Sequence, residues 1–218
     1  TDEYGRDILS RIIYGTRVSL SVGILAQVIA TIIGVTMGSL AAYYGGWVDT
    51  VISRIMEIFA AFPDLIFAMA IMTFMGKGVL NLFIALGLLT WVRTARMIRG
   101  SVMQLKEKEY VEAARACGAS TYWIIMKELV PNCLSTIIVL VTLGIPNAIM
   151  YEASLSFLGI GIQPPTPSWG NMISAAQTFI SYRPVYSIMP GVAIMITVIA
   201  FNIFGDGLRD ALDPKLRS

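Results

Sequence analysis

Few residue types in this sequence could carry out covalent chemistry. Histidine, the commonest general base and metal ligand, is absent from all 218 residues. The two cysteines, Cys117 and Cys133, cannot by themselves build a disulfide framework or a zinc site. The sequence also lacks the GxxxxGK(S/T) loop that holds nucleotide phosphates. We therefore expect no catalytic residue, no metal site and no cofactor in this chain.

Polar side chains inside apolar runs are the remaining candidates for function. Asp64 follows Pro63 in the middle of such a run, where a charge costs about 2.5–3.5 kcal/mol on insertion scales. It should line a solute path beside a proline kink, or else be tied to a neighbouring helix. Glu152 ends another run, shortly after Pro146 and Asn147, and an outer-interface or inter-helix hydrogen bond is favoured over contact with a solute. Asp64, Asn147 and Glu152 are the candidate path residues.

Long runs of apolar residues predict the elements that hold these side chains. Hydrophobic residues make up 56% of the chain and charged residues 14%, whereas soluble domains carry about 25% charged residues. A soluble domain buried on both sides of a sheet is the alternative on composition alone. Crossing about 30 Å of hydrocarbon takes about 20 apolar residues, and five runs qualify: 18–48, 52–75, 79–98, 129–151 and 184–205. We predict an all-α, polytopic membrane helix bundle that forms one domain over residues 1–218, its second and third spans antiparallel neighbours.

Basic residues predict the orientation, since they concentrate in cytoplasmic loops. Seven of the 16 lie in the loop from Arg93 to Glu128, which begins at the end of the third span: Arg93, Arg96, Arg99, Lys106, Lys108, Arg115 and Lys127. Arg54, Arg209, Lys215 and Arg217 fall on the same side, so Thr1 should lie outside and Ser218 in the cytoplasm. Arg93, Arg96 and Arg99 are three residues apart and should anchor their helix to lipid phosphates. The net charge of +2 gives no argument for a nucleic-acid partner.

The segment 93–130 contains a pattern that predicts two short helices joined by a turn. Glu112, Ala113 and Ala114 lie among good helix formers, and Gly118 stands where a helix ends with φ > 0. Ser120 could cap a second helix, and Pro131 marks the start of the next span. Small side chains, Ala119 among them, would let another protein approach closely.

This pattern resembles the EAA loop of ATP-binding-cassette importer permeases, although Glu128 and Val130 stand where that family usually has Ile and Leu. Residues 1–11 resemble the stretch before the second helix of the C-type permease subunit of bacterial peptide, nickel and opine importers. Residues 156–161 and 163–171 resemble the external loop of that subunit, which spans residues 156–184 here. The resemblance covers essentially the whole chain.

The resemblance implies a type I importer permease of the bacterial plasma membrane, with six spans in the full-length protein. Such a subunit pairs with a homologous B-type permease, two ATPase subunits that bind ATP and Mg²⁺, and an external solute-binding protein. Glu112, Ala113, Ala114, Gly118, Ala119 and Pro131 would then couple the chain to the ATPase. Its substrates would be di- or oligopeptides or similar small solutes, and nickel chelates, glutathione and opines are the alternatives.

The external segment has two interpretations. Gln163, Pro164, Pro165 and Trp169 could form a stiff loop with an interfacial aromatic anchor, or a preordered surface for the binding protein or the partner permease, and we prefer the second. A self-contained channel or secondary transporter is a different class of function. It usually shows inverted repeats or ionisable relays within its spans, and we see neither here.

Overall fold

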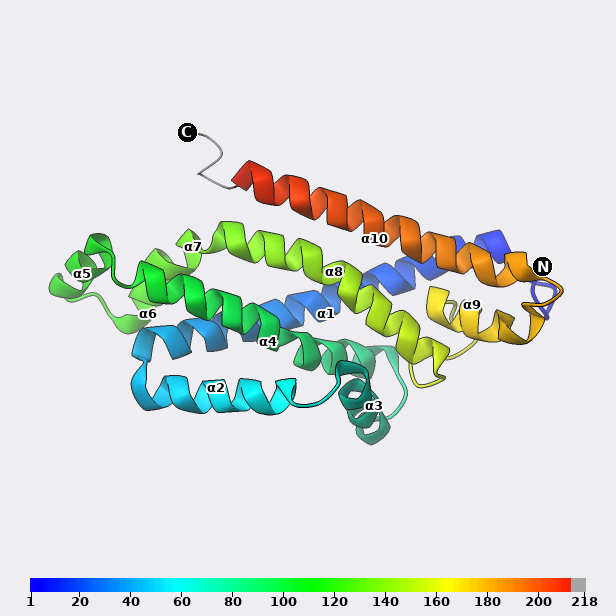
Figure 1. Cartoon of the computed structure of the whole chain (residues 1–218), viewed down its shortest axis with the longest axis horizontal. Helices are drawn as coiled ribbons and strands as arrows, with labels where there is room; N and C mark the ends of the chain where they lie inside the picture. Colours follow the sequence, from blue (N-terminus) through cyan, green and yellow to red (C-terminus); the bar gives the residue numbers. More distant parts are fainter. Residues whose placement is uncertain (213–218) are drawn as a thin grey trace.

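The computed structural model describes residues 1–212, and these contain helices and loops but no strand. Four long helices run side by side along the molecule (Figure 1): α1 (Ile8–Tyr44), α4 (Val79–Leu105), α8 (Leu134–Phe157) and α10 (Pro184–Leu212). The shorter helices are α2 (Gly46–Ala60), α3 (Asp64–Met75), α5 (Glu109–Ala116), α6 (Thr121–Trp123), α7 (Val130–Asn132) and α9 (Trp169–Ala176). A π-helical stretch covers Ile124–Leu129 and a 3₁₀ turn Gln177–Phe179. Lys215, Arg217 and Ser218, which entered the orientation argument, lie outside the described residues.

The four long helices are each long and apolar enough to cross a membrane. The predicted spans 18–48, 79–98, 129–151 and 184–205 are thus confirmed as helices, with boundaries that differ by several residues. The largest difference is in α1, which has 37 residues and begins at the Asp7 cap, where the side chain accepts a hydrogen bond from the Ser10 backbone. At 1.5 Å per residue it is about 55 Å long, so it extends beyond the hydrocarbon layer.

The predicted span 52–75 is not one continuous helix. It consists of α2 and α3, which meet at an angle of 93° after a three-residue break, so the chain has five spans only if this bent pair counts as one. Pro63 causes the break, because proline has no backbone N–H and pushes the preceding residue out of the helical region. Pro63 itself is extended, with φ −59° and ψ 129°, and α3 starts directly after it at Asp64.

Close packing of α1 against α4 forms the centre of the bundle. Gly34 and Gly38 of α1 face the backbone of α4: a Cβ atom built on Gly38 would lie 2.5 Å from the Ala95 carbonyl oxygen, and one on Gly34 would lie 2.9 Å from that of Trp91. Small residues permit such close approach between membrane helices. The two predicted extramembrane segments lie at opposite ends of the bundle (Figure 1), α5 and α6 at one end and α9 with the N-terminus at the other.

A methyl group at the α1–α4 contact should destabilise the bundle. We expect Gly38→Ala to lower the stability of the purified protein by about 1–3 kcal/mol, because the added Cβ must displace backbone rather than a movable side chain. Gly100→Ala in α4 is the matched control, since no atom lies within 4 Å of its Cβ position. Thermal unfolding in detergent measures both variants. Equal midpoints for the two would contradict the close contact.

Candidate functional site

A polar pocket lies where α1, α2, α3, α4 and α8 meet. Its volume is about 470 Å³, and its charged lining residues are Asp64, Arg93 and Arg96. Asp64 occupies the first turn of α3, where the helix dipole favours a carboxylate. The Tyr151 hydroxyl of α8 donates a hydrogen bond to it. The Asp64 side chain thus lines this pocket and is also tied to a neighbouring helix, and its place in a solute path stays a prediction.

The three arginines of α4 do not act alike. Arg99 forms a bidentate ion pair with Asp49 of α2, with both N–O distances 2.5 Å. Arg93 and Arg96 instead line the polar pocket. The prediction that all three anchor the helix to lipid phosphates is therefore wrong for Arg99, whose guanidinium binds a carboxylate. For Arg93 and Arg96 it stays a prediction. The three-residue spacing predicts that these arginines share one face of the helix, but it does not predict which groups pack against that face.

The two other candidate path residues occupy different surroundings. Asn147 of α8 is exposed, lines the pocket and donates a hydrogen bond to the Leu143 carbonyl at 3.2 Å. Glu152 is fully buried, with 0% of its surface exposed, and lies outside the pocket lining. It accepts hydrogen bonds from Ser19 of α1 at 2.9 Å and from Ser156 at 2.7 Å. The inter-helix role expected for Glu152 is confirmed, and the structure gives its carboxylate no contact with the pocket.

The external segment packs inward more than the sequence suggested. Trp169 is only 1% exposed, and its indole N–H donates to the Ile12 carbonyl at 3.2 Å. The prediction of an interfacial anchor or an exposed docking side chain is wrong for Trp169, because its ring fills the space between α1 and α8. Pro164 and Pro165 are exposed and Gln163 is partly exposed. These three remain available to a partner, and Trp169 fixes the loop that carries them.

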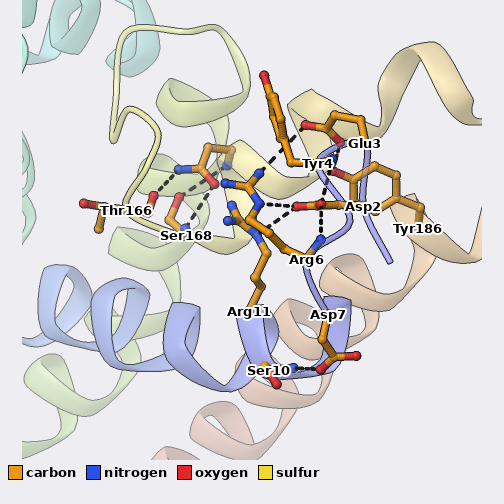
Figure 2. A network of polar contacts seen from close by, with 11 residues as sticks. Asp2, Glu3, Tyr4, Arg6, Asp7, Ser10, Arg11, Thr166, Ser168 and Tyr186 are labelled. Carbon is orange, nitrogen blue, oxygen red and sulfur yellow. Dashed lines mark hydrogen bonds and ion pairs between the residues drawn. The ribbon is translucent and has the colours of Figure 1, made fainter.

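Buried charges also join the N-terminal segment to this end of the bundle. Figure 2 shows the Asp2 carboxylate with Arg6 and Arg11 directed toward it, at 2.6 and 3.6 Å. The Asp2 side chain is 0% exposed and also accepts hydrogen bonds from the backbone of Tyr4 and Arg6. The hydroxyl of Tyr186 in α10 donates to the neighbouring Glu3. Sequence reasoning missed this cluster, since charges at a chain terminus usually indicate a solvated surface.

The Asp2 carboxylate should stabilise the protein in a pH-dependent way. Burial acts to raise its pKa, but hydrogen bonds from Arg6 and Tyr4, with the Arg6 charge, outweigh burial and hold the pKa below the usual value. A lowered native pKa stabilises the fold above the ordinary carboxyl pKa of about 4, and this stabilisation is lost as the pH falls through the native value.

We expect Asp2→Asn to lower stability by about 1–2 kcal/mol at neutral pH, because Arg6 and Arg11 lose their anionic partner. The difference from the wild type should shrink as the pH falls below about 4. Thermal unfolding at a series of pH values measures it, with Asp210→Asn at an exposed position of α10 as the control. A difference that is independent of pH would contradict the assignment.

The predicted elbow of two short helices is present at the other end of the bundle. The helix α5 ends at Ala116, Gly118 has φ +80°, and the Ser120 side chain caps α6 by accepting a hydrogen bond from the Trp123 N–H at 3.3 Å. The expected glycine conformation and serine cap are both confirmed. Buried side chains hold the elbow against the ends of α1, α4 and α8: Ala42, Ile98, Val102, Val111, Ile124, Ile125, Leu129 and Cys133.

The coupling candidates of this elbow differ in exposure. Glu112, Ala113, Gly118 and Pro131 are exposed, whereas Ala114 and Ala119 are partly buried and pack against the elbow core. The exposed set leaves one face of α5 and its turn open to another protein. The small side chains of the two partly buried alanines allow the elbow to pack closely against this core.

Comparison with known proteins gives close relatives over the full chain. Residues 34–218 match the family described as "Binding-protein-dependent transport system inner membrane component". The chain is 45% identical over 217 residues to the glutathione transport system permease protein GsiD of Pectobacterium atrosepticum, covering 100% of this chain and 72% of that protein. It is 46% identical over 218 residues to the dipeptide transport system permease protein DppC of Alkalihalophilus pseudofirmus, with the same coverage.

Solved structures share the fold at lower identity. An inward-facing structure of the MetNI methionine ABC transporter superposes with a TM-score of 0.76 at 20% identity, covering 94% of this chain and 97% of that chain. An amino acid ABC transporter solved with histidines gives a TM-score of 0.69 at 17% identity, covering 95% and 99%. The predicted all-α importer-permease fold is confirmed. The chain belongs to the family of binding-protein-dependent transport system inner membrane components, the non-catalytic permease subunits of ATP-binding-cassette importers.

Proposed function

We propose that this permease takes up di- or oligopeptides or closely similar small solutes such as glutathione. The observation that carries this proposal is the identity of 45–46% along the whole chain to permeases named for glutathione and dipeptide transport. The polar pocket supports it, because a charged lining suits solutes that carry charged ends. Nickel chelates and opines remain the competing substrates.

We infer that the chain works with a homologous B-type permease, two ATPase subunits that bind ATP and Mg²⁺, and an external solute-binding protein. The elbow end of the bundle would face the cytoplasm, since it carries most of the basic residues expected there, and the end with Thr1 would face outward. The position of the two segments at opposite ends of the bundle supports this orientation (Figure 1).

We infer further that residues 93–130 form the loop that couples the chain to its ATPase. Glu112 and Ala113 present an exposed helix face, and Gly118 fixes the angle between α5 and α6. Val111 belongs to a buried cluster with Ala42 of α1 and Ile98 of α4, and this cluster would make the elbow move together with the ends of those two helices. At the other end, within residues 156–184, Gln163, Pro164 and Pro165 would meet the binding protein or the partner permease.

The substrate class can be tested on the binding protein that serves this transporter. We expect mass spectrometry of the ligand that co-purifies with it to find a peptide, and the assembled transporter to accumulate that peptide in proteoliposomes only with ATP. A metal chelate or an opine as the bound ligand would overturn the peptide assignment. Accumulation without ATP hydrolysis would contradict the importer mechanism.

The coupling loop can be tested at Gly118. No atom lies within 4 Å of a Cβ built there, so Gly118→Val acts through backbone conformation and not through a clash. A positive φ costs a β-branched residue about 1–3 kcal/mol, which should tilt the second helix. Combined with Glu112→Lys, this change should abolish ATP-driven uptake while the permease still inserts and assembles.

Gly118→Asn is the matched control, since asparagine tolerates positive φ better than valine and should keep most of the uptake. Uptake, ATP hydrolysis and the number of bound ATPase subunits are measured together on the purified complex. Wild-type uptake by the Gly118→Val, Glu112→Lys double variant would rule out the coupling assignment.

A further inference from the structure

Two arginines in the polar pocket have no internal partner. Among residues 1–212, five ion pairs form, and none of them includes Arg93 or Arg96. Arg93 and Arg96 both lie in the second half of the 27-residue helix α4. Both side chains are exposed toward the pocket, whereas Arg99 one turn further on is paired with Asp49. Within the described residues, the two guanidinium groups of the pocket lining thus form no ion pair.

The same pocket holds one negative charge on other helices. Asp64 comes from the start of α3 and is held by the Tyr151 hydroxyl of α8, while the Asn147 amide adds a neutral polar group. The formal charges of the lining are thus two positive and one negative. The volume of about 470 Å³ lies within the 300–1,000 Å³ that is usual for sites binding small organic ligands.

We propose that this pocket selects among peptides by charge, with Arg93 and Arg96 each binding a carboxylate and Asp64 binding the ammonium group. The preferred solutes would carry two carboxylates and one ammonium group, as glutathione and dipeptides with one acidic side chain do. This inference rests on the proposed function of peptide import. The inference goes beyond that function because it specifies the charge of the preferred peptides and the residues that recognise this charge.

The chemistry of the side chains supports this assignment. A guanidinium presents a planar fork of N–H donors that matches a carboxylate in a bidentate arrangement. A second carboxylate on the peptide satisfies the second arginine, whereas a neutral dipeptide leaves one guanidinium without a partner. A lysine-containing dipeptide would bring a second ammonium group toward two positive charges, which disfavours its passage.

The test uses the complete transporter in proteoliposomes, with its own binding protein and ATP. Uptake is measured for glutathione, alanylalanine and alanyllysine in the wild type and in an Arg93→Gln, Arg96→Gln double variant. The ratio of variant to wild-type uptake is taken for each solute, so the selectivity of the unchanged binding protein cancels. We expect glutathione uptake to fall about tenfold more than alanylalanine uptake, because a charge-assisted hydrogen-bond pair is lost.

Three further variants sharpen the comparison. Arg93→Lys with Arg96→Lys keeps the charge but not the fork, and should lose less glutathione uptake than the glutamine pair. Asp64→Asn should reduce uptake of alanyllysine more than that of glutathione. Arg54→Gln is the control, since Arg54 lies outside the pocket in an exposed pair with Glu57, and it should leave all three ratios equal.

The outcomes separate this inference from the function on which it rests. If the wild type transports these peptides and the glutamine pair lowers uptake of all three equally, the arginines serve assembly and the charge-selection proposal is overturned. The single variants Arg93→Gln and Arg96→Gln repeat the comparison if the double variant fails to assemble. If the wild type takes up none of the three peptides, the proposed function fails and this inference fails with it.

Discussion

A membrane interior offers no water to backbone N–H and C=O groups, so a helix can break there only where other polar groups or a water-filled space replace the missing hydrogen bonds. The break between α2 and α3 follows from this constraint. Pro63 separates α2 from α3, and Asp64 in the first turn of α3 accepts a hydrogen bond from the Tyr151 hydroxyl. The polar pocket thus lies beside the break at Pro63, with Phe59 and Ala60 of α2 and Asp64 of α3 in its lining.

The charged side chains discussed above fall into two groups, those with partners inside the protein and those that line the pocket. The Asp2 side chain and the whole of Glu152 are 0% exposed. Arginines bind the Asp2 carboxylate, and serine hydroxyl groups donate hydrogen bonds to Glu152. Such groups join segments that are distant in sequence, and breaking them leaves a buried polar group unpaired. Arg93 and Arg96 differ from these groups, since they are exposed, line the pocket that also holds Asp64, and form no ion pair in the described part of the chain. We interpret the charged groups that have partners inside the protein as structural, and the unpaired arginines that line the pocket as candidates for binding a ligand.

Sequence reasoning predicted the elements whose causes are local. Apolar length alone identified the four long helices, and a glycine followed by a serine identified the elbow at Gly118 and Ser120. It could not give the 93° bend, since a proline indicates a break but not the direction of the next helix. It also misjudged Trp169 and Arg99, because which neighbour covers a side chain depends on packing between helices that are far apart in sequence.

One helix connects the two functional candidates. The C-terminal part of α4 carries Ile98 and Val102 into the cluster that holds the elbow, and a turn or two earlier the helix carries Arg93 and Arg96 into the pocket lining. Arg96 and Val102 are six residues apart, which is about 9 Å along a helix axis. A helix transmits displacement over such a distance as a rigid body, and the backbone contact at Gly38 couples it to α1 as well. Allosteric coupling needs contacts that differ between two states. If the elbow is the proposed ATPase contact, a difference in how it is seated would move the helix that positions Arg93 and Arg96.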